Sequence, residues 1–275
     1  MNTDARHLVF GDDGSAAADV VWLWINNHCW PDWRISVVTA HQPSMGRPTG
    51  SERSSPHPWD PPTPRRLLSA GETTQVEHLM AEADPRLVLD SFKDVALMTI
   101  GPRGAGLLKH LHIGSTAEWL VSAHRPLAPL AVIRSARPTR QVLLCVDGSV
   151  HAQRAAETLA NLPWIGDTHV TILGVTDGDA EVEGGVEDAA RLLESRDITT
   201  AQKRLTAAIP QTATFDVRST ILDTIAEDSP DLVVMGTRGV GGIRRTVLGS
   251  TASAVLHHAP CSVLIARAPE DGGDH

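Results

Sequence analysis

Two segments of this 275-residue chain share a glycine pattern that is suited to holding an anion. In the first half, Gly101–Gly104 is followed after nine residues by Gly114–Thr116. In the second half, Gly236–Gly239 is followed after nine residues by Gly249–Thr251, so the copies are 135 positions apart throughout. Glycines let a backbone approach a ligand closely, and a Gly-Ser-Thr sequence that opens a helix offers N–H groups and hydroxyls to a phosphate. The pattern therefore predicts two phosphate-binding loops in a duplicated domain.

An acidic residue recurs beside each loop. Each half opens with a short apolar run that ends in an acid and a turn, Leu8–Ser15 in the first half and Val142–Ser149 in the second. Asp13 and Asp147 end these runs, at the sheet edge where ligands of open α/β sheets bind. A carboxylate does not bind a phosphate by itself, but it can accept hydrogen bonds from a ribose or hold a bridging metal ion. Asp12 adds a second carboxylate that could repel phosphates or recruit Mg²⁺.

Alternating strand and helix patterns position these residues in the second half. Ser149 is placed to cap a helix, and a helical spacing of apolar residues continues to Pro210 after an acidic loop over 177–185. A further short helix covers 220–227, and the last helix covers 250–258. Apolar runs of strand length fall at 142–146, 169–175, 214–217, 232–235 and 261–266. This order predicts a parallel sheet with helices on both faces.

The first half follows the same plan, with one gap. Ser15 is placed to cap a helix with an apolar stripe at Ala18, Val21, Trp22 and Ile25. A Pro- and Ser-rich segment over 42–64 replaces the long helix of the second half, and we expect a loop there. Strand patterns fall at 8–10, 35–40, 76–80, 96–100 and 130–133. With a linker over 135–140, the chain divides into two Rossmann-like α/β domains of five strands each, 1–136 and 137–275.

Composition and charge exclude several classes of protein. The net charge of −9 leaves no basic surplus to replace the counterions of a nucleic acid. The three cysteines are scattered in apolar stretches, which indicates buried thiols in a reducing compartment. No signal-peptide pattern opens the chain, and the longest apolar run, Val20–Ile25, is too short to span a bilayer. We therefore expect a cytoplasmic protein that binds neither nucleic acid nor membranes.

The last strand of each half would form a sheet edge unless it is paired. These strands, Leu130–Ile133 and Val263–Ala266, are apolar. In a chain with two such domains they can pair with each other, which would give an internal pseudo-dimer, and further association into a homodimer stays open. Trp22, Trp24, Trp30 and Trp33 are expected to fill the core and an interface.

The arrangement resembles the universal stress protein family in its tandem-domain form, over nearly the whole chain. The resemblance rests on the two Asp-Gly-Ser openings, on Met235–Gly242, on Gly249–Ser253 and on the closing His257–Leu264. The doubled glycine motif is similar to that of the ATP-binding branch. The resemblance implies an adenine nucleotide α-hydrolase-like fold and a regulatory protein of the stress response that binds ATP or AMP, with little or no turnover.

The resemblance also implies roles for individual residues. In the second half, Asp147 would meet the adenosine, Val175 would lie against the adenine, Gly239, Gly249, Ser250 and Thr251 would hold phosphates, and Met235, Gly236 and Arg238 would line the site. In the first half, the same roles fall on Asp13, Ala40, Gly104, Gly114, Ser115 and Thr116, with Ile100, Gly101 and Arg103 lining the site. Asp12 and the proline-rich crossover depart from the pattern, so the second site is the stronger prediction.

Two alternatives remain open from the sequence alone. No phosphate loop with Gly-Lys-Ser or Gly-Lys-Thr and no His-Glu-x-x-His or Cys-x-x-Cys motif is present, and no base or nucleophile is recognisable, so we expect no enzyme. A slow Mg²⁺-dependent ATP hydrolase is the first alternative, because of Asp12 and Asp13. A nucleotide-free interaction module, in which the glycines only make turns, is the second. The neighbouring His257 and His258 make a poor metal site, and no metal ligands are predicted.

Overall fold

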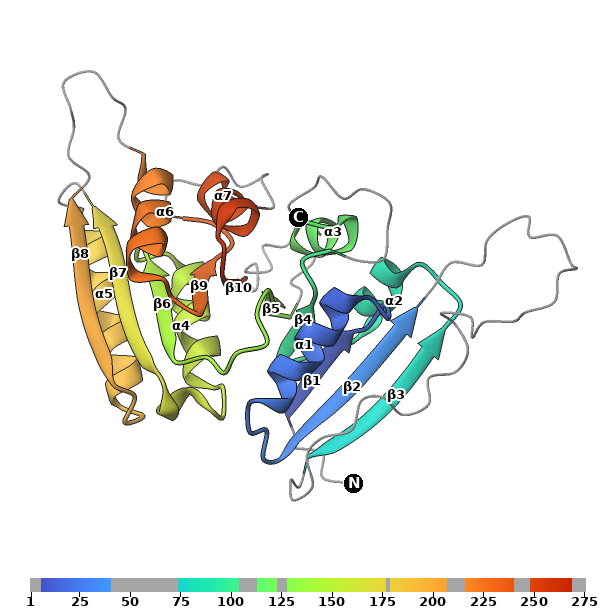
Figure 1. The fold of residues 1–275 in the computed structure, drawn as a ribbon. Helices are drawn as coiled ribbons and strands as arrows, with labels where there is room; N and C mark the ends of the chain where they lie inside the picture. The colour runs from blue at the N-terminus through green and yellow to red at the C-terminus, as the bar shows by residue number, and fades with distance from the viewer. Residues whose placement is uncertain are drawn as a thin grey trace, which may run out of the picture.

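Ten strands form one continuous sheet in the computed structural model, which describes residues 6–40, 74–103, 113–122, 128–176, 179–206, 216–239 and 248–268 (Figure 1). The strand order is β3-β2-β1-β4-β5-β10-β9-β6-β7-β8. The strands are β1 (Arg6–Gly11), β2 (Trp33–Ala40), β3 (Gln75–Ala81), β4 (Leu97–Ile100), β5 (Leu130–Val132), β6 (Gln141–Val146), β7 (His169–Thr176), β8 (Thr200–Thr206), β9 (Leu232–Gly236) and β10 (Ser262–Ala266).

The two halves of the sheet repeat one topology. Neighbouring strands are parallel everywhere except at β5 and β10, which pair antiparallel with Leu264 opposite Ala131. Within each half the order reverses beside the first strand, between β1 and β4 and between β6 and β9. The expected pairing of the two final strands is confirmed. This pairing joins the five strands of each half into one sheet of ten.

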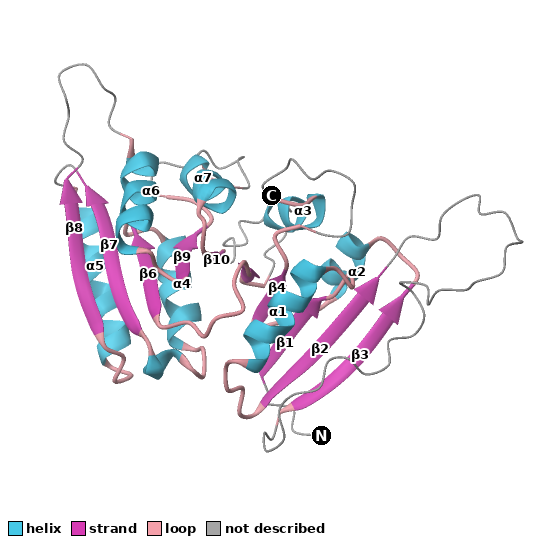
Figure 2. Ribbon diagram, in the orientation of Figure 1, coloured by secondary structure: helices cyan, strands magenta, loops and turns pink. Residues whose placement is uncertain are grey.

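Helices cover both faces of the sheet (Figure 2). One core layer contains the apolar stripes of α1 (Ala16–Asn26), α4 (Val150–Ala160) and α5 (Ala180–Glu194). The other contains those of α2 (Pro85–Ser91), α3 (Ser115–Ser122), α6 (Val217–Asp228) and α7 (Ser250–His258). A short 3-10 helix, Ile165–Asp167, precedes β7. The expected α/β architecture, with a largely parallel sheet between two helical layers, is therefore confirmed.

The caps of the first helices are confirmed in both halves. The Ser15 hydroxyl accepts a hydrogen bond from the Ala18 amide at 3.2 Å, and the Ser149 hydroxyl accepts one from the Ala152 amide at 3.1 Å. A serine oxygen at this position satisfies one of the N–H groups that a helix leaves without an internal partner. Both helices therefore begin directly after the acidic turns.

The segment between β7 and α6 differs from its prediction. The sequence predicts a loop over 177–185, a helix continuing to Pro210 and a strand at 214–217. Instead α5 begins at Ala180, where the Asp179 carboxylate accepts from the Glu181 amide at 2.9 Å, and it ends at Glu194. The next segment forms β8, and Val217 opens α6 instead of ending a strand. Gly185 lies inside this helix and lets it approach the turn before α4 closely, because a Cβ there would sit 2.6 Å from the Gly148 nitrogen.

Helix α2 was not predicted, although its signal is present. Asp84 accepts a hydrogen bond from the Arg86 amide at 2.9 Å, and Pro85 occupies the first helical position. An N-cap acid followed by proline is a favourable helix start. The predicted proline-rich loop over 42–64 lies outside the described residues.

A cluster of aromatic side chains joins the two halves. Trp24 lies 5.6 Å from Trp164 between ring centroids and 5.9 Å from Trp30, and its Nε1 donates to the Thr139 hydroxyl at 3.1 Å. His28 accepts a hydrogen bond from the Thr139 amide through Nε2 at 3.0 Å. Thr139 lies in the connection between β5 and β6, so this cluster fixes that connection against α1. The expectation that the tryptophans fill core and interface is confirmed, since Trp22, Trp24, Trp30 and Trp33 are all buried.

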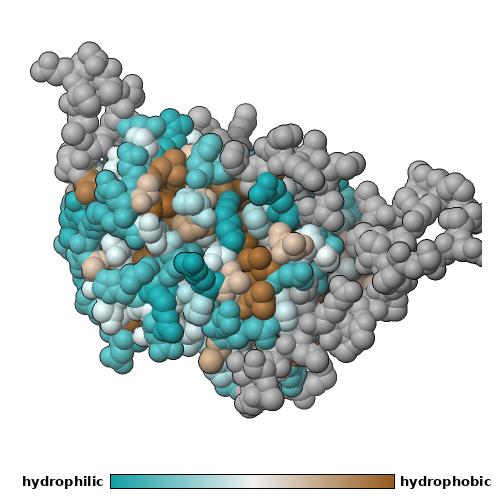
Figure 3. Space-filling model, in the orientation of Figure 1, coloured by the Kyte–Doolittle hydropathy of each residue, from teal (hydrophilic) through white to brown (hydrophobic). Residues whose placement is uncertain are grey.

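The surface seen in the orientation of Figure 1 is largely hydrophilic, with apolar residues in small separate groups (Figure 3). Five large apolar side chains are exposed among the described residues: Leu23, Leu79, Met80, Leu87 and Val150. Scattered apolar residues of this kind are ordinary on a protein surface. The cysteine prediction is wrong in part, because Cys145 is buried whereas Cys261 is half-buried and Cys29 is exposed. Cys29 lies beyond the end of α1, outside its buried stripe.

Two buried histidines make the stability depend on pH. Burial lowers the pKa of His28, and also that of His7, below the ordinary value of 6.5. A histidine with a lowered folded-state pKa binds fewer protons when folded, so stability is lost as pH falls from the unfolded pKa through the folded one. We expect the free energy of unfolding to decrease from about pH 7.5 to about pH 5.5, by at most about 1.4 kcal/mol per pH unit for each histidine.

Urea denaturation at a series of pH values measures this effect. His28→Gln should make the free energy of unfolding depend less on pH, because a glutamine side chain does not titrate. In the wild-type protein, protonation of His28 Nε2 removes the hydrogen bond that this nitrogen accepts from the Thr139 amide. His78→Gln changes an exposed side chain and serves as the control. An unchanged slope in His28→Gln would contradict this assignment.

Candidate functional site

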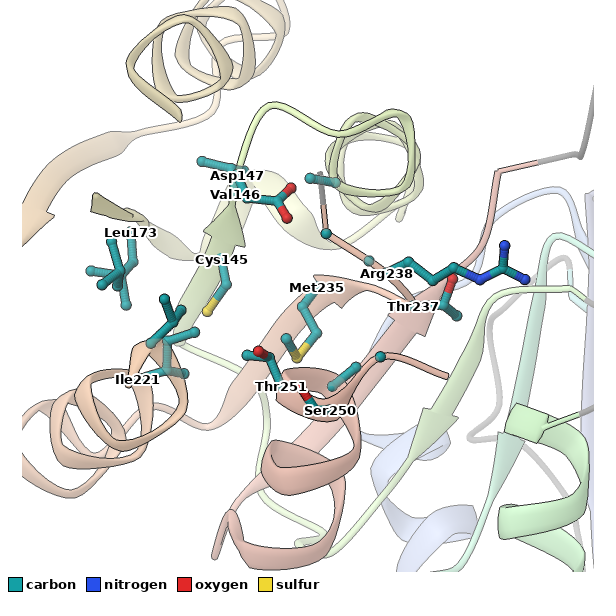
Figure 4. Close-up of a pocket in the computed structure, with 17 residues that line it drawn as sticks. Cys145, Val146, Asp147, Leu173, Ile221, Met235, Thr237, Arg238, Ser250 and Thr251 are labelled. Atoms are coloured by element: carbon teal, nitrogen blue, oxygen red, sulfur yellow. The ribbon is translucent and has the colours of Figure 1, made fainter. Parts of the chain in front are cut away.

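A pocket of about 280 Å³ lies at the carboxyl ends of β6, β7 and β9, between α6 and the start of α7 (Figure 4). This is the point in the second half where the strand order reverses, which is where open α/β sheets hold their ligands. All nine second-half residues named from the sequence line the pocket: Asp147, Val175, Met235, Gly236, Arg238, Gly239, Gly249, Ser250 and Thr251. The structure therefore brings together residues that are more than 100 positions apart in the chain.

The start of α7 forms the polar end of the pocket. Gly249 occupies the N-cap position and supplies no side-chain hydrogen bond to the first turn. Its amide donates to the Thr237 carbonyl at 2.7 Å, which fixes the loop ahead of the helix. Ser250 and Thr251 follow directly and line the pocket. A helix start without a side-chain cap keeps N–H donors and the positive end of the helix dipole available to an anion.

Two glycines allow the backbone to close around this end. A Cβ on Gly239 would lie 2.5 Å from Oδ2 of Asp147, and a Cβ on Gly249 would lie 3.0 Å from the Thr237 carbonyl oxygen. The other oxygen of Asp147, Oδ1, accepts a hydrogen bond from the Ser149 amide at 3.1 Å. The turn before α4 thus holds the Asp147 carboxylate in place. The carboxylate lies directly against the backbone of Gly239, with no side chain between them.

The other end of the pocket is apolar. Eight of the residues that line the pocket were not predicted as site residues, and most of them are apolar: Cys145, Val146, Ala152, Leu173, Val217, Ile221, Thr237 and Ala252. Leu173 stands two positions before Val175 on β7, so strand alternation places both on the same face, and Cys145 lies on β6 two positions before Asp147, which follows that strand. Burial raises the pKa of the Cys145 thiol to about 12, so it is a protonated, largely apolar part of the wall near neutral pH.

Thr237 and Arg238 follow β9 at the rim of the pocket. In Figure 4 the Arg238 side chain extends away from Asp147 and Ser250. Thr237 is 3% exposed, and its hydroxyl oxygen has no hydrogen-bond partner among the described residues. Buried polar groups are normally paired, so this hydroxyl is a polar group that a bound molecule or water would satisfy.

The first half repeats the scaffold of the pocket. The Gly114 amide donates to the Pro102 carbonyl at 2.7 Å, as the Gly249 amide does to Thr237. The Asp13 carboxylate accepts from the Ser15 amide at 3.0 Å, as Asp147 does from Ser149. Of the remaining first-half residues named from the sequence, Ala40 and Ile100 are buried, Gly101 and Thr116 are half-buried, and Ser115 and Arg103 are exposed. Gly104 lies outside the described residues.

The described ranges contain no group of three or more His, Cys, Asp or Glu side chains that could hold a metal ion. Among the described helices, none has both the length and the apolar character that crossing a membrane requires.

Fold and pocket together define an α/β protein with a crevice at the point where the strand order of a largely parallel sheet reverses. Residues 138–267 match the protein family described as the Universal stress protein family. The second half of the chain is therefore similar to a universal stress protein domain.

Known proteins and structures of this family resemble the chain. A universal stress protein of Mycolicibacterium smegmatis is 28% identical over 217 residues, which cover 72% of this chain and 70% of that protein. A universal stress protein of Thermus aquaticus is 28% identical over 135 residues, covering 46% of this chain and 98% of that protein. The crystal structure of a universal stress protein from Archaeoglobus fulgidus has the same fold, with a TM-score of 0.65, 17% identity and coverage of 96% of this chain and 99% of that one.

Proposed function

We propose that this protein binds an adenine nucleotide, ATP or AMP, in the second-half pocket and acts as a regulatory protein of the stress response. The observation that carries the proposal is the convergence of all nine residues named from the sequence on one pocket with a polar and an apolar end. The match of residues 138–267 to the Universal stress protein family favours the stress-response role.

The described residues fit such a ligand. The phosphates would lie at the start of α7, where Gly239, Gly249, Ser250 and Thr251 offer backbone amides and two hydroxyls. The Asp147 carboxylate can accept hydrogen bonds from a ribose. The base would lie at the apolar end, near Val175. The pocket volume of about 280 Å³ is close to the lower limit of about 300 Å³ for small-molecule sites.

We infer little or no turnover of the nucleotide. The carboxylate among the described lining residues, Asp147, already accepts the Ser149 amide, and the raised pKa of Cys145 keeps its thiol protonated. Neither is arranged as an activated nucleophile. Multiple-turnover assays with ATP and Mg²⁺ test this inference: steady release of ADP at ordinary enzymatic rates, about one per second or faster, would favour the hydrolase alternative.

We extend the proposal to a second site in the first half, with 1–136 and 137–275 as two domains of the same family. The repeated loop and carboxylate contacts support this extension. The Mycolicibacterium smegmatis alignment covers 72% of the chain, more than the second half alone can supply. The antiparallel pairing of β5 with β10 would then be the interface of an internal pseudo-dimer.

Isothermal titration calorimetry tests the proposal. We expect saturable heat with ATP, and weaker binding of adenosine and of inorganic phosphate, since each of these fills only one end of the pocket. The stoichiometry distinguishes one occupied half from two. Absence of heat and of a thermal shift at millimolar ATP would reject nucleotide binding and leave the interaction module as the account of the fold.

A further inference from the structure

Two arginines cross between the halves of the sheet in a reciprocal arrangement. Arg134, which follows β5, donates from its guanidinium to the Leu256 carbonyl at 2.6 Å and to the Cys261 carbonyl at 3.2 Å. Arg267, which follows β10, donates from its guanidinium to the Val121 carbonyl at 2.9 Å. Leu256 belongs to α7 and Val121 to α3. Each half therefore holds the last turn of a helix of the other half.

Arg134 binds the carboxyl-terminal end of α7. Leu256 is among the last four residues of the helix, whose carbonyls have no partner within it. A cation at this end also interacts favourably with the helix dipole. The Arg134 amide adds a bond to the Ser262 hydroxyl at 3.1 Å, and burial lowers the pKa of its guanidinium, so the contact is partly shielded from solvent. A shielded charged contact is stronger than one on the surface.

The opposite end of α7 is the polar end of the pocket. The helix has nine residues, so its two ends are separated by about 13 Å. Arg134 is not among the residues that line the pocket. Any effect of Arg134 on a ligand there must therefore be transmitted through the elements that it contacts, which are α7 and the start of β10.

We propose that Arg134 is a positioning residue for the second-half pocket, so that nucleotide affinity in one half depends on a side chain of the other. The inference rests on the proposed function of that pocket. Through Leu256 and Cys261, Arg134 fixes α7 and the start of β10 relative to the first half. Fixing the helix places the amides after Gly249 where the phosphates would bind.

Arg134→Ala and Arg267→Ala form a matched pair of variants. Both remove a cross-half arginine, but only the first releases α7. The readout is hydrogen–deuterium exchange of peptides from α7 as ATP is titrated, since protection there reports occupancy of the second-half pocket. We expect Arg134→Ala to weaken the ATP affinity roughly three- to tenfold, and Arg267→Ala to change it less than about twofold. Both variants should lower the melting temperature.

Each outcome decides one claim. If ATP does not protect α7 in the wild-type chain, the proposed function fails. If ATP protects α7 and the two alanine variants bind it equally well, the positioning role is overturned while nucleotide binding stands. If Arg134→Ala does not fold, the comparison moves to Arg134→Lys and Arg267→Lys, which keep the charge. Arg134→Lys should then bind ATP more weakly than Arg267→Lys, because a lysine cannot hold both carbonyls in the geometry of the guanidinium.

Discussion

Replacing Gly239 by valine is expected to remove most of the thermal shift that ATP produces, while the fold is kept. A Cβ at this position would lie 2.5 Å from Oδ2 of Asp147, so the valine must displace the carboxylate or the loop. Gly239 is exposed, so the substitution leaves the core untouched. A displaced loop would lose at least one hydrogen bond to the charged phosphates of ATP. Such a loss costs about 2 kcal/mol, which corresponds to a roughly 30-fold weaker affinity for ATP.

Gly166→Ala is the matched control for this variant. Gly166 is exposed, and a Cβ there would meet no atom within 4 Å. It should keep the full ATP-induced shift in melting temperature. A Gly239→Val protein that melts like the wild type and still responds fully to ATP would contradict the location of the site.

Of the substitutions proposed here, Trp24→Ala is expected to lower the free energy of unfolding the most. Trp24 is 2% exposed, packs against Trp30 and Trp164, and donates to the Thr139 hydroxyl. Truncating a buried tryptophan typically costs about 3–5 kcal/mol, because the transfer energy is lost and a cavity remains. Urea denaturation should therefore give a free energy of unfolding lower by that amount.

The neighbouring Leu23 provides the control. Its side chain is 52% exposed, so Leu23→Ala should change the free energy of unfolding by less than about 0.5 kcal/mol. If Trp24→Ala lowered the free energy of unfolding no more than Leu23→Ala does, the aromatic cluster would not be what holds the connection between the halves against α1.

The regular parts of the fold could be predicted because local signals agree there with tertiary packing. The buried strands and the serine caps at Ser15 and Ser149 are examples. The error at β8 has a simple cause. Ala201 and Leu205 are four positions apart, and residues four apart share a face both in a helix and in a strand. The alternation of half-buried Lys203 with exposed Gln202 and Arg204 shows that the strand period governs this segment.

Some residues of the candidate site could be predicted from the sequence, and others could not. The glycines could be predicted because only glycine permits the close backbone approach found at these positions. Asp147 could be predicted because it is the acid that follows the first apolar strand of the second half. Val217 and Ile221 reach the pocket only because α6 packs over it, and the sequence places a strand where that helix begins. Such tertiary contacts have no local signature. In the first half, Gly104 lies outside the described residues, so the nucleotide site proposed there is still a prediction.

A crystal structure of the protein grown with ATP tests the central claim most directly. We expect phosphate density against Gly249, Ser250 and Thr251 at the start of α7, with the base at the apolar end beside Val175. Density for the nucleotide elsewhere, or a second-half pocket filled by the protein's own side chains in the presence of saturating ATP, would contradict it.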